Sequence, residues 1–300
     1  MRNAEKIKEK AHELGFELVG ISPAHPAPDF DFFRWWLDKG FGATMTYLNR
    51  QAERRGDPEK VLPGVKSVIC VALNYHTGAA GGRIASYAHG EDYHRVIGEK
   101  LRTLEAFIVA TVDPSAKTKS YIDTGPVLER SYAARAGLGW IGKNTMLLND
   151  GLGSYVFLGE ILTTLAFGEE DYGRPALDQC GTCTKCLDAC PTQAFPEPGV
   201  LDANRCISYL TIEYKKDFTP EQAQMAAGHL YGCDVCQAVC PYNDRIPSSP
   251  LKEFWTREVI RVFLRDETKR LDEADFFRLI AGSAMDRISF KQWKRNCGEK

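Results

Sequence analysis

Residues 180–191 read Cys180-Gly-Thr-Cys183-Thr-Lys-Cys186-Leu-Asp-Ala-Cys190-Pro191. This spacing, C-x2-C-x2-C-x3-C-P, is the run with which bacterial two-cluster ferredoxins hold cubane iron–sulfur clusters. Residues 233–241 repeat the second half of the pattern, and Cys206 lies between the two runs. These eight cysteines match the number that two [4Fe–4S] clusters require, so the sequence predicts a ferredoxin-like module here.

In such modules the cysteine that precedes proline crosses to the other cluster. The sequence therefore predicts two ligand sets: Cys180, Cys183, Cys186 and Cys240 on one cluster, and Cys190, Cys206, Cys233 and Cys236 on the other. Zinc and disulfides are the alternatives. Zinc usually takes paired C-x2-C motifs, which this run resembles poorly. Disulfides need an oxidising compartment, and nothing in the sequence indicates one.

The whole chain is longer than one ferredoxin module needs, since 300 residues are typical of two domains. A net charge of −2 gives no overall electrostatic footprint for nucleic acid, so an RNA partner would be bound by a local patch. The N-terminus shows no signal sequence, and no stretch has the roughly 20 apolar residues of a membrane span. We therefore expect a cytoplasmic protein without a membrane partner.

Hydrophobic periodicity predicts alternating helices and strands up to about residue 165, hence an α/β sandwich around a central sheet. Helices are expected at 3–14, 29–39 (capped by Asp29) and 93–110, and strands at 16–21, 67–73, 119–123 and 154–162. Thr124-Gly-Pro126 is expected to turn the chain into a further helix, with Pro126 at its first position. Cys70 is expected in the core. Helices are also expected at 252–265, 272–281 and 286–296.

These elements divide the chain into an α/β domain at 1–174, the two-cluster module at 175–250 and a helical segment at 251–300. Residues 137–142 match the dinucleotide-binding pattern G-x-G-x-x-G, which requires a preceding strand and a following helix. Here the preceding residues 132–136 are helical in pattern, so the glycines are expected to end a helix instead.

Five further motifs resemble those of one family, epoxyqueuosine reductase. They are Gly90-Glu-Asp-Tyr-His94, Asp123-Thr-Gly-Pro-Val-Leu-Glu-Arg130, Arg135-Ala-Gly-Leu-Gly-Trp-Ile-Gly-Lys-Asn144, Arg205-Cys-Ile-Ser-Tyr-Leu-Thr-Ile-Glu213 and Leu230-Tyr-Gly-Cys-Asp-Val-Cys236. The resemblance runs from about residue 5 to residue 296. It implies an α/β (α+β) cobalamin-binding domain related to reductive dehalogenases, a bacterial-ferredoxin-like two-[4Fe–4S] module and C-terminal helices.

The resemblance also implies an activity: removal of the epoxide oxygen from epoxyqueuosine at the wobble position of tRNA, giving queuosine. Electrons would pass from the clusters to cobalamin, and Asp123 would donate a proton to the departing oxygen. A carboxylate near a helix N-terminus has a lowered pKa, whereas burial against an apolar corrin would raise it. The positions that match the family's cobalamin contacts are Arg55, Asp123, Leu147, Leu158, Ser208 and Asp234, with Lys143 and Asn144 as further candidates.

The implied partners are tRNA carrying epoxyqueuosine and an unidentified low-potential electron donor, with a monomer as the expected state. Many members continue into a C-terminal helical-repeat domain that grips tRNA, whereas this sequence stops near its start, as expected for a short or trimmed form. Two alternatives remain: a dehalogenase-like reductase of another substrate, and a non-catalytic two-cluster electron carrier.

A basic stretch near the C-terminus is the expected phosphate contact. Such a stretch is ordinarily only a solvated helix face. Its cationic residues are Arg287, Lys291, Lys294, Arg295 and Lys300, together with Lys215 and Lys216.

Overall fold

The computed structural model describes residues 2–78, 82–265 and 271–299. Its centre is a four-stranded sheet in which every neighbouring pair is antiparallel. Across the sheet the order is β1 (Leu18–Pro23), β2 (Ser67–Asn74), β6 (Val156–Thr163) and β3 (Thr118–Tyr121). The predicted strands are confirmed, with bounds shifted by one or two residues.

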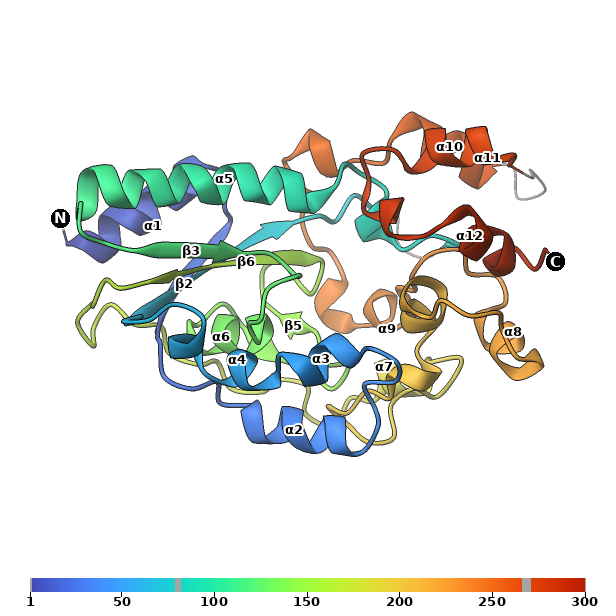
Figure 1. The fold of residues 1–300 in the computed structure, drawn as a ribbon, viewed down its shortest axis with the longest axis horizontal. Helices are drawn as coiled ribbons and strands as arrows, with labels where there is room; N and C mark the ends of the chain where they lie inside the picture. Colours follow the sequence, from blue (N-terminus) through green and yellow to red (C-terminus); the bar gives the residue numbers. More distant parts are fainter. Residues whose placement is uncertain (1, 79–81, 266–270, 300) are drawn as a thin grey trace.

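Strand β2 explains why the fold has a core on each face of the sheet, because all eight of its residues are buried. Side chains alternate along a strand, so Ile69 and Val71 enter one core while Val68 and Cys70 enter the other. Helices α1 (Asn3–Glu13) and α5 (Tyr93–Phe107) cover the first face, and α6 (Glu129–Arg135) covers the second (Figure 1). Cys70 is a core residue, as expected.

Two local expectations are wrong. The second expected helix is α2 (Phe30–Asp38), but the Asp29 side chain makes no capping hydrogen bond. Helix α6 begins at Glu129 rather than at Pro126, because residues 122–128 form a loop in which Asp123 has a left-handed backbone. The glycine prediction is confirmed, since Gly137 follows the end of α6 with φ of +82°.

The cysteine-rich segment packs beside the sheet domain as short helices joined by turns (Figure 1). Its α-helices are α7 (Lys185–Asp188), α8 (Pro220–Ala226) and α9 (Val235–Ala238). Residues from early in the chain anchor it: the Trp36 indole donates to the Leu201 carbonyl at 2.6 Å, and Ile84 forms a short parallel bridge with Tyr231. The sheet domain and the cysteine-rich segment therefore share an interface.

The C-terminal segment lies above this junction and contains α10 (Glu258–Arg265), α11 (Glu273–Ile280) and α12 (Phe290–Asn296). The three expected helices are confirmed, although short 3₁₀ turns occupy the starts of the first and third, at Lys252–Phe254 and Ala284–Arg287. The remaining α-helices and strands are α3 (Thr46–Arg50), α4 (Ala52–Gly56) and the hairpin of β4 (Trp140–Ile141) and β5 (Leu147–Leu148). None of the described helices combines the length and apolarity needed to cross a bilayer.

Candidate functional site

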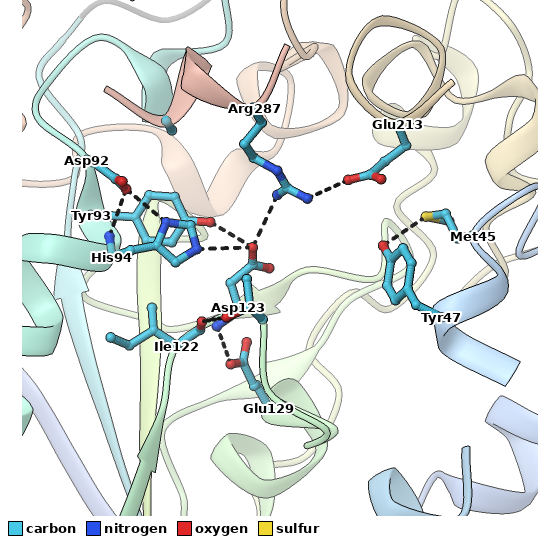
Figure 2. Close-up of polar contacts among 12 residues, drawn as sticks. Met45, Tyr47, Asp92, Tyr93, His94, Ile122, Asp123, Glu129, Glu213 and Arg287 are labelled. Atoms are coloured by element: carbon cyan, nitrogen blue, oxygen red, sulfur yellow. Dashed lines mark hydrogen bonds and ion pairs between the residues drawn. The ribbon is translucent and has the colours of Figure 1, made fainter. Parts of the chain in front are cut away.

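Asp123 lies two residues beyond β3, where three parts of the chain meet. Its Oδ2 accepts a hydrogen bond from the Tyr93 hydroxyl at 2.9 Å. The same oxygen lies 3.5 Å from His94 Nε2 and 3.4 Å from an Arg287 guanidinium nitrogen. Figure 2 shows the Asp123 carboxylate pointing into this ring of donors. Because the Asp123 side chain is still 45% exposed, it is both held by neighbours and open to a reactant.

The start of α5 places the histidine of this array. Asp92 is the N-cap of α5, and its Oδ1 accepts the His94 backbone N–H at 3.0 Å. The same Oδ1 lies 2.8 Å from His94 Nδ1, so the imidazole sits between two carboxylates, Asp92 and Asp123. The ring is also stacked on that of Tyr93 at 4.1 Å. The Asp92 helix cap therefore fixes Nδ1 of His94 and leaves Nε2 facing Asp123.

The electrostatics place a proton on the histidine. Burial would lower the pKa of His94, but the Asp123 and Asp92 carboxylates that face its two ring nitrogens raise it to about 9. Partial burial would raise the pKa of Asp123, but the contacts with His94 and Tyr93 and the charge of Arg287 hold it below its usual value. At neutral pH the free site therefore contains a His94 imidazolium beside an Asp123 carboxylate. Polar neighbours, rather than a helix N-terminus, lower this pKa.

Arg287 connects the array to the cysteine-rich segment. Its second terminal nitrogen lies 2.6 Å from Glu213 Oε1, so the guanidinium bridges Glu213 and Asp123 (Figure 2). Burial would lower the pKa of Arg287, but these two carboxylates raise it. Tyr47 lies on the other side of Asp123 from Tyr93 and His94 (Figure 2), and burial followed by the charge of Glu213 raises the pKa of its phenol.

The expected cobalamin contacts are divided between two regions. Arg55 is 8% exposed and donates to the Val127 carbonyl at 3.1 Å, while its Nε has no partner among the described residues. Leu147 and Leu158 pack in the core on the same side of the sheet as Val127. A buried guanidinium with a spare donor beside apolar side chains fits an amide-bearing, largely apolar macrocycle.

The other expected contacts lie in the cysteine-rich segment or contact it from the sheet domain. Ser208 hydrogen-bonds to the Cys206 thiol, and Asp234 accepts the Ser86 backbone N–H at 2.7 Å. Lys143 donates to two carbonyls of the first cysteine run, those of Gly181 at 2.6 Å and Cys183 at 3.0 Å. Asn144 donates to the Cys236 carbonyl of the second run at 3.3 Å. Lys143 and Asn144 therefore fasten the sheet domain to the cysteine runs.

Electrostatic interactions among the cysteines expected to hold clusters fall into two groups. Burial and then neighbouring thiols raise the pKa of Cys240, and those neighbours are Cys180 and Cys183. The same causes raise the pKa of Cys236, but its neighbouring thiols are Cys206, Cys233 and Cys190. Cys186 belongs with the first group, since Cys240 and Cys180 lie near it. The crossed ligand sets stay a prediction, and all ten cysteines of the chain are free thiols.

The basic stretch is mostly occupied by internal contacts. The Arg295 guanidinium donates to the carbonyls of Leu210, Tyr214 and Lys216 at 2.6 to 2.9 Å and lies 3.9 Å from the centre of the Phe218 ring. Three more cations have partners: Arg287 in the Asp123 array, Lys291 on Asp217, and Lys215 on two carbonyls. Lys300 lies outside the described residues. The expectation of a free phosphate patch is therefore weakened.

Several site residues carried no individual role in the sequence-based prediction. Tyr93 and His94 lie inside the motif 90–94, and Arg287 lies in the basic stretch. Glu160 lies in the predicted strand 154–162, where a carboxylate within an apolar run is a signal for a buried acid. Arg287 had no comparable signal, because its partners are far away in sequence.

Comparisons with known proteins identify both halves of the molecule. The family model described as "4Fe-4S double cluster binding domain" matches residues 179–243, and that described as "Epoxyqueuosine reductase QueG, DUF1730" matches residues 55–124. The epoxyqueuosine reductase of Gloeobacter violaceus is 43% identical over 98% of this chain and 94% of its own. That of Vibrio cholerae is 37% identical over 98% of this chain and 81% of its own.

Solved structures agree with these relatives. A crystal structure of epoxyqueuosine reductase with an epoxyqueuosine-modified tRNA-Tyr stem loop has a TM-score of 0.86 at 32% identity, over 98% of this chain and 79% of that one. The Bacillus subtilis enzyme, in a structure with its catalytic aspartate loop swung out of the active site, has a TM-score of 0.85 at 31% identity with the same coverage. The chain belongs to the epoxyqueuosine reductase family of oxidoreductases and contains a double [4Fe–4S] cluster-binding domain.

Proposed function

We propose that this chain reduces epoxyqueuosine in tRNA to queuosine and that Asp123 donates a proton to the departing epoxide oxygen. Removal of the oxygen as water consumes an electron pair and a pair of protons. The observation that carries the proposal is the His94–Asp123 pair, because it holds a transferable proton at a carboxylate that is open to a reactant. Membership of the family supplies the reaction class.

The proton path follows from the two pKa shifts. In the free site Asp123 is ionised, so it cannot itself be the initial acid. A bound nucleoside would displace water from its half-exposed side chain and raise its pKa, because a desolvated carboxylate favours the neutral form. The proton of His94 Nε2 would then move to Asp123 Oδ2, and from there to the substrate oxygen. Asp92 would stabilise the imidazolium through Nδ1, which lies 2.8 Å from its carboxylate.

The cofactors of this reaction are two [4Fe–4S] clusters and cobalamin. Cys180, Cys183, Cys186 and Cys240 would hold one cluster, and Cys190, Cys206, Cys233 and Cys236 the other. When bound, cobalamin supplies a low-potential metal centre that can reduce or attack an epoxide carbon. Arg55, Leu147 and Leu158 would hold the corrin from the sheet domain, with Asp123, Ser208 and Asp234 as further contacts.

This proposal gives each part of the chain a task. Residues 1–174 would form the cobalamin and substrate domain, 175–250 would conduct single electrons inward from an unidentified low-potential donor, and 251–300 would complete the site through Arg287. The contacts of Lys143 and Asn144 with the cysteine runs support a close approach of clusters and substrate domain. The tRNA partner is supported by the relative solved with a modified stem loop, and a monomer is the expected working form.

Replacing Asp123 by Asn tests the proton-donor role. The amide keeps the shape but cannot deliver a carboxylic proton, so turnover should fall by about two to four orders of magnitude. Cluster content, cobalamin content and tRNA affinity should stay near wild type, since the lost interaction belongs to the transition state. The measurement is queuosine released from digested tRNA, followed by mass spectrometry.

Asp113→Asn is the matched control, because Asp113 lies at the surface and its carboxylate accepts hydrogen bonds from Ser115 alone among the described residues. It should retain full activity. An Asp123→Asn enzyme that holds its cofactors and turns over at a near-normal rate would exclude Asp123 as the donor.

A further inference from the structure

The backbone of Asp123 is held in a conformation that L-residues rarely adopt. Its φ is +55°, in the left-handed region, where a residue with a Cβ is strained. Such strain persists only when the surroundings hold the residue in place, and it concentrates at functional sites. The hydrogen bonds on the Asp123 carboxylate aim the side chain, but the backbone needs a restraint of its own.

Glu129 restrains the backbone of Asp123. Its Oε1 accepts the Asp123 backbone N–H at 2.5 Å, and Figure 2 shows it on the opposite side of Asp123 from His94. The next peptide group is tied in as well, because Thr124 N–H donates to the Ile122 carbonyl at 2.5 Å. A Cβ added at Gly125 would lie 2.4 Å from the Tyr121 ring, so the loop also packs tightly against the end of β3.

Under Glu129 lies a second acid that the proposed reaction leaves unused. Glu160 projects from β6, one of the two inner strands, is fully buried, and neither of its oxygens has a hydrogen-bond partner among the described residues. In the register of the sheet it pairs with Cys70 of β2 on one side and Tyr121 of β3 on the other. A buried polar group without a partner is costly unless it serves a purpose.

The charged surroundings show how this acid can be tolerated. Burial and then the charge of Glu129 raise the pKa of Glu160 well above its usual value, so Glu160 is a neutral acid. Burial and the charge of Asp123 raise the pKa of Glu129 as well, against the lowering effects of the Asp123 amide and Arg130. The remaining groups that face the pair are Arg55 of α4, on the Glu129 side, and the Cys70 thiol, on the Glu160 side.

We propose that Glu129 is a positioning residue for Asp123. Glu129 fixes the strained amide, and the carboxylate of Asp123 is thereby aimed at His94. The inference rests on the proposed role of Asp123. The Bacillus subtilis relative with its catalytic aspartate loop swung out shows that such a loop has an alternative position in the family, which makes a restraint of this kind consequential.

The test compares Glu129→Ala with Glu129→Gln in the holoenzyme. Alanine removes the acceptor, so kcat should fall about 10- to 100-fold, the usual cost of a misplaced catalytic group, with KM for modified tRNA nearly unchanged. Glutamine keeps a side-chain oxygen at the same position and should restore kcat to within about fivefold of wild type. Glu59→Ala is the matched control, because Glu59 also accepts a backbone N–H, that of Gly64 at 2.9 Å, in an exposed turn.

A double-mutant cycle separates positioning from general damage. If Glu129 acts through Asp123, adding Glu129→Ala to Asp123→Asn should cost less than about twofold more. Hydrogen exchange followed by mass spectrometry should show faster exchange of the loop 122–128 in Glu129→Ala, but not in Glu129→Gln, and this readout does not depend on turnover. Cluster absorbance confirms that each variant is folded.

Three results would overturn the inference: equal damage from Gln and Ala, full additivity with Asp123→Asn, or unchanged exchange of the loop in Glu129→Ala. Failure of the proposed function looks different, because then Asp123→Asn itself would be near normal. In that case a loss of kcat in Glu129→Ala could not act through Asp123, and the positioning role would be excluded with it.

Discussion

The pKa of His94 should fall when the charge of Asp123 is removed. A rise from 6.5 to about 9 corresponds to roughly 3 kcal/mol in favour of the imidazolium. Asp92 at 2.8 Å and Asp123 at 3.5 Å share this effect against the opposing burial. A neighbouring opposite charge typically accounts for at least about one unit. Asp123→Asn should therefore bring the pKa of His94 to about 8 or below.

The assay is an NMR titration of ¹³C-labelled histidine ring carbons in the oxidised protein, with His94→Gln used to assign the resonance among the six histidines. Asp92→Asn should lower the same pKa, because it removes the partner of Nδ1. Asp113→Asn should leave it unchanged. An unaltered His94 pKa in Asp123→Asn would refute the electrostatic coupling on which the proton path depends.

The same pair makes a pH-dependent contribution to stability. The folded pKa of His94 lies above its ordinary value, so the folded state binds this proton more tightly than the unfolded state. The contribution is therefore complete below about pH 6.5 and is lost as the pH rises through about 9. In Asp123→Asn this loss should be smaller and should occur at lower pH.

Two further predictions concern the cysteine-rich segment and the basic stretch. Cys190→Ser should remove the cluster of the Cys206 group and leave that of the Cys180 group intact, as judged by iron content and electron paramagnetic resonance of the reduced protein; loss confined to the Cys180 group would refute the crossed ligation. Arg295→Ala should lower the free energy of unfolding in urea by about 2–4 kcal/mol, because three carbonyls and the Phe218 ring lose their partner. Lys294→Ala is its control and should change stability by less than about 0.5 kcal/mol; equal effects would contradict the structural role of Arg295.

The parts of the fold that depend on local pattern could be predicted from sequence. The cysteine spacing is a covalent requirement of the cluster, and the apolar run 67–73 had to become a buried strand. The order and antiparallel direction of the strands could not be predicted in the same way, because pairing depends on contacts between β2 and β6, almost 90 residues apart. The predicted start of α6 is too early. Pro126 suits a first helical position, but the loop that follows the left-handed Asp123 extends to residue 128, and the helix begins only at Glu129.

In the candidate site, too, the features set by a local motif could be predicted and those set by distant contacts could not. Asp123 could be chosen from its motif, but its protonation state could not, since it depends on Arg287, 164 residues later. Glu129 lies only six residues after Asp123 in the sequence. Its contact with the Asp123 amide, however, requires a left-handed backbone at Asp123, which the residue type does not predict. The sequence therefore does not predict those properties of the site that depend on contacts between residues far apart in the chain or on an unusual backbone conformation.

The short bridge between Ile84 and Tyr231 has a consequence for the order in which the chain folds and receives its clusters. With the bond from Ser86 to Asp234, it joins segments that lie 148 residues apart. Contacts so distant along the chain form late in folding, since a long loop must close before they can stabilise anything. Clusters that bind only the folded segment would then shift the folding equilibrium toward the state in which these contacts are formed. We therefore expect the supply of iron and sulfide, rather than the formation of the sheet, to set when a newly made chain acquires its finished site.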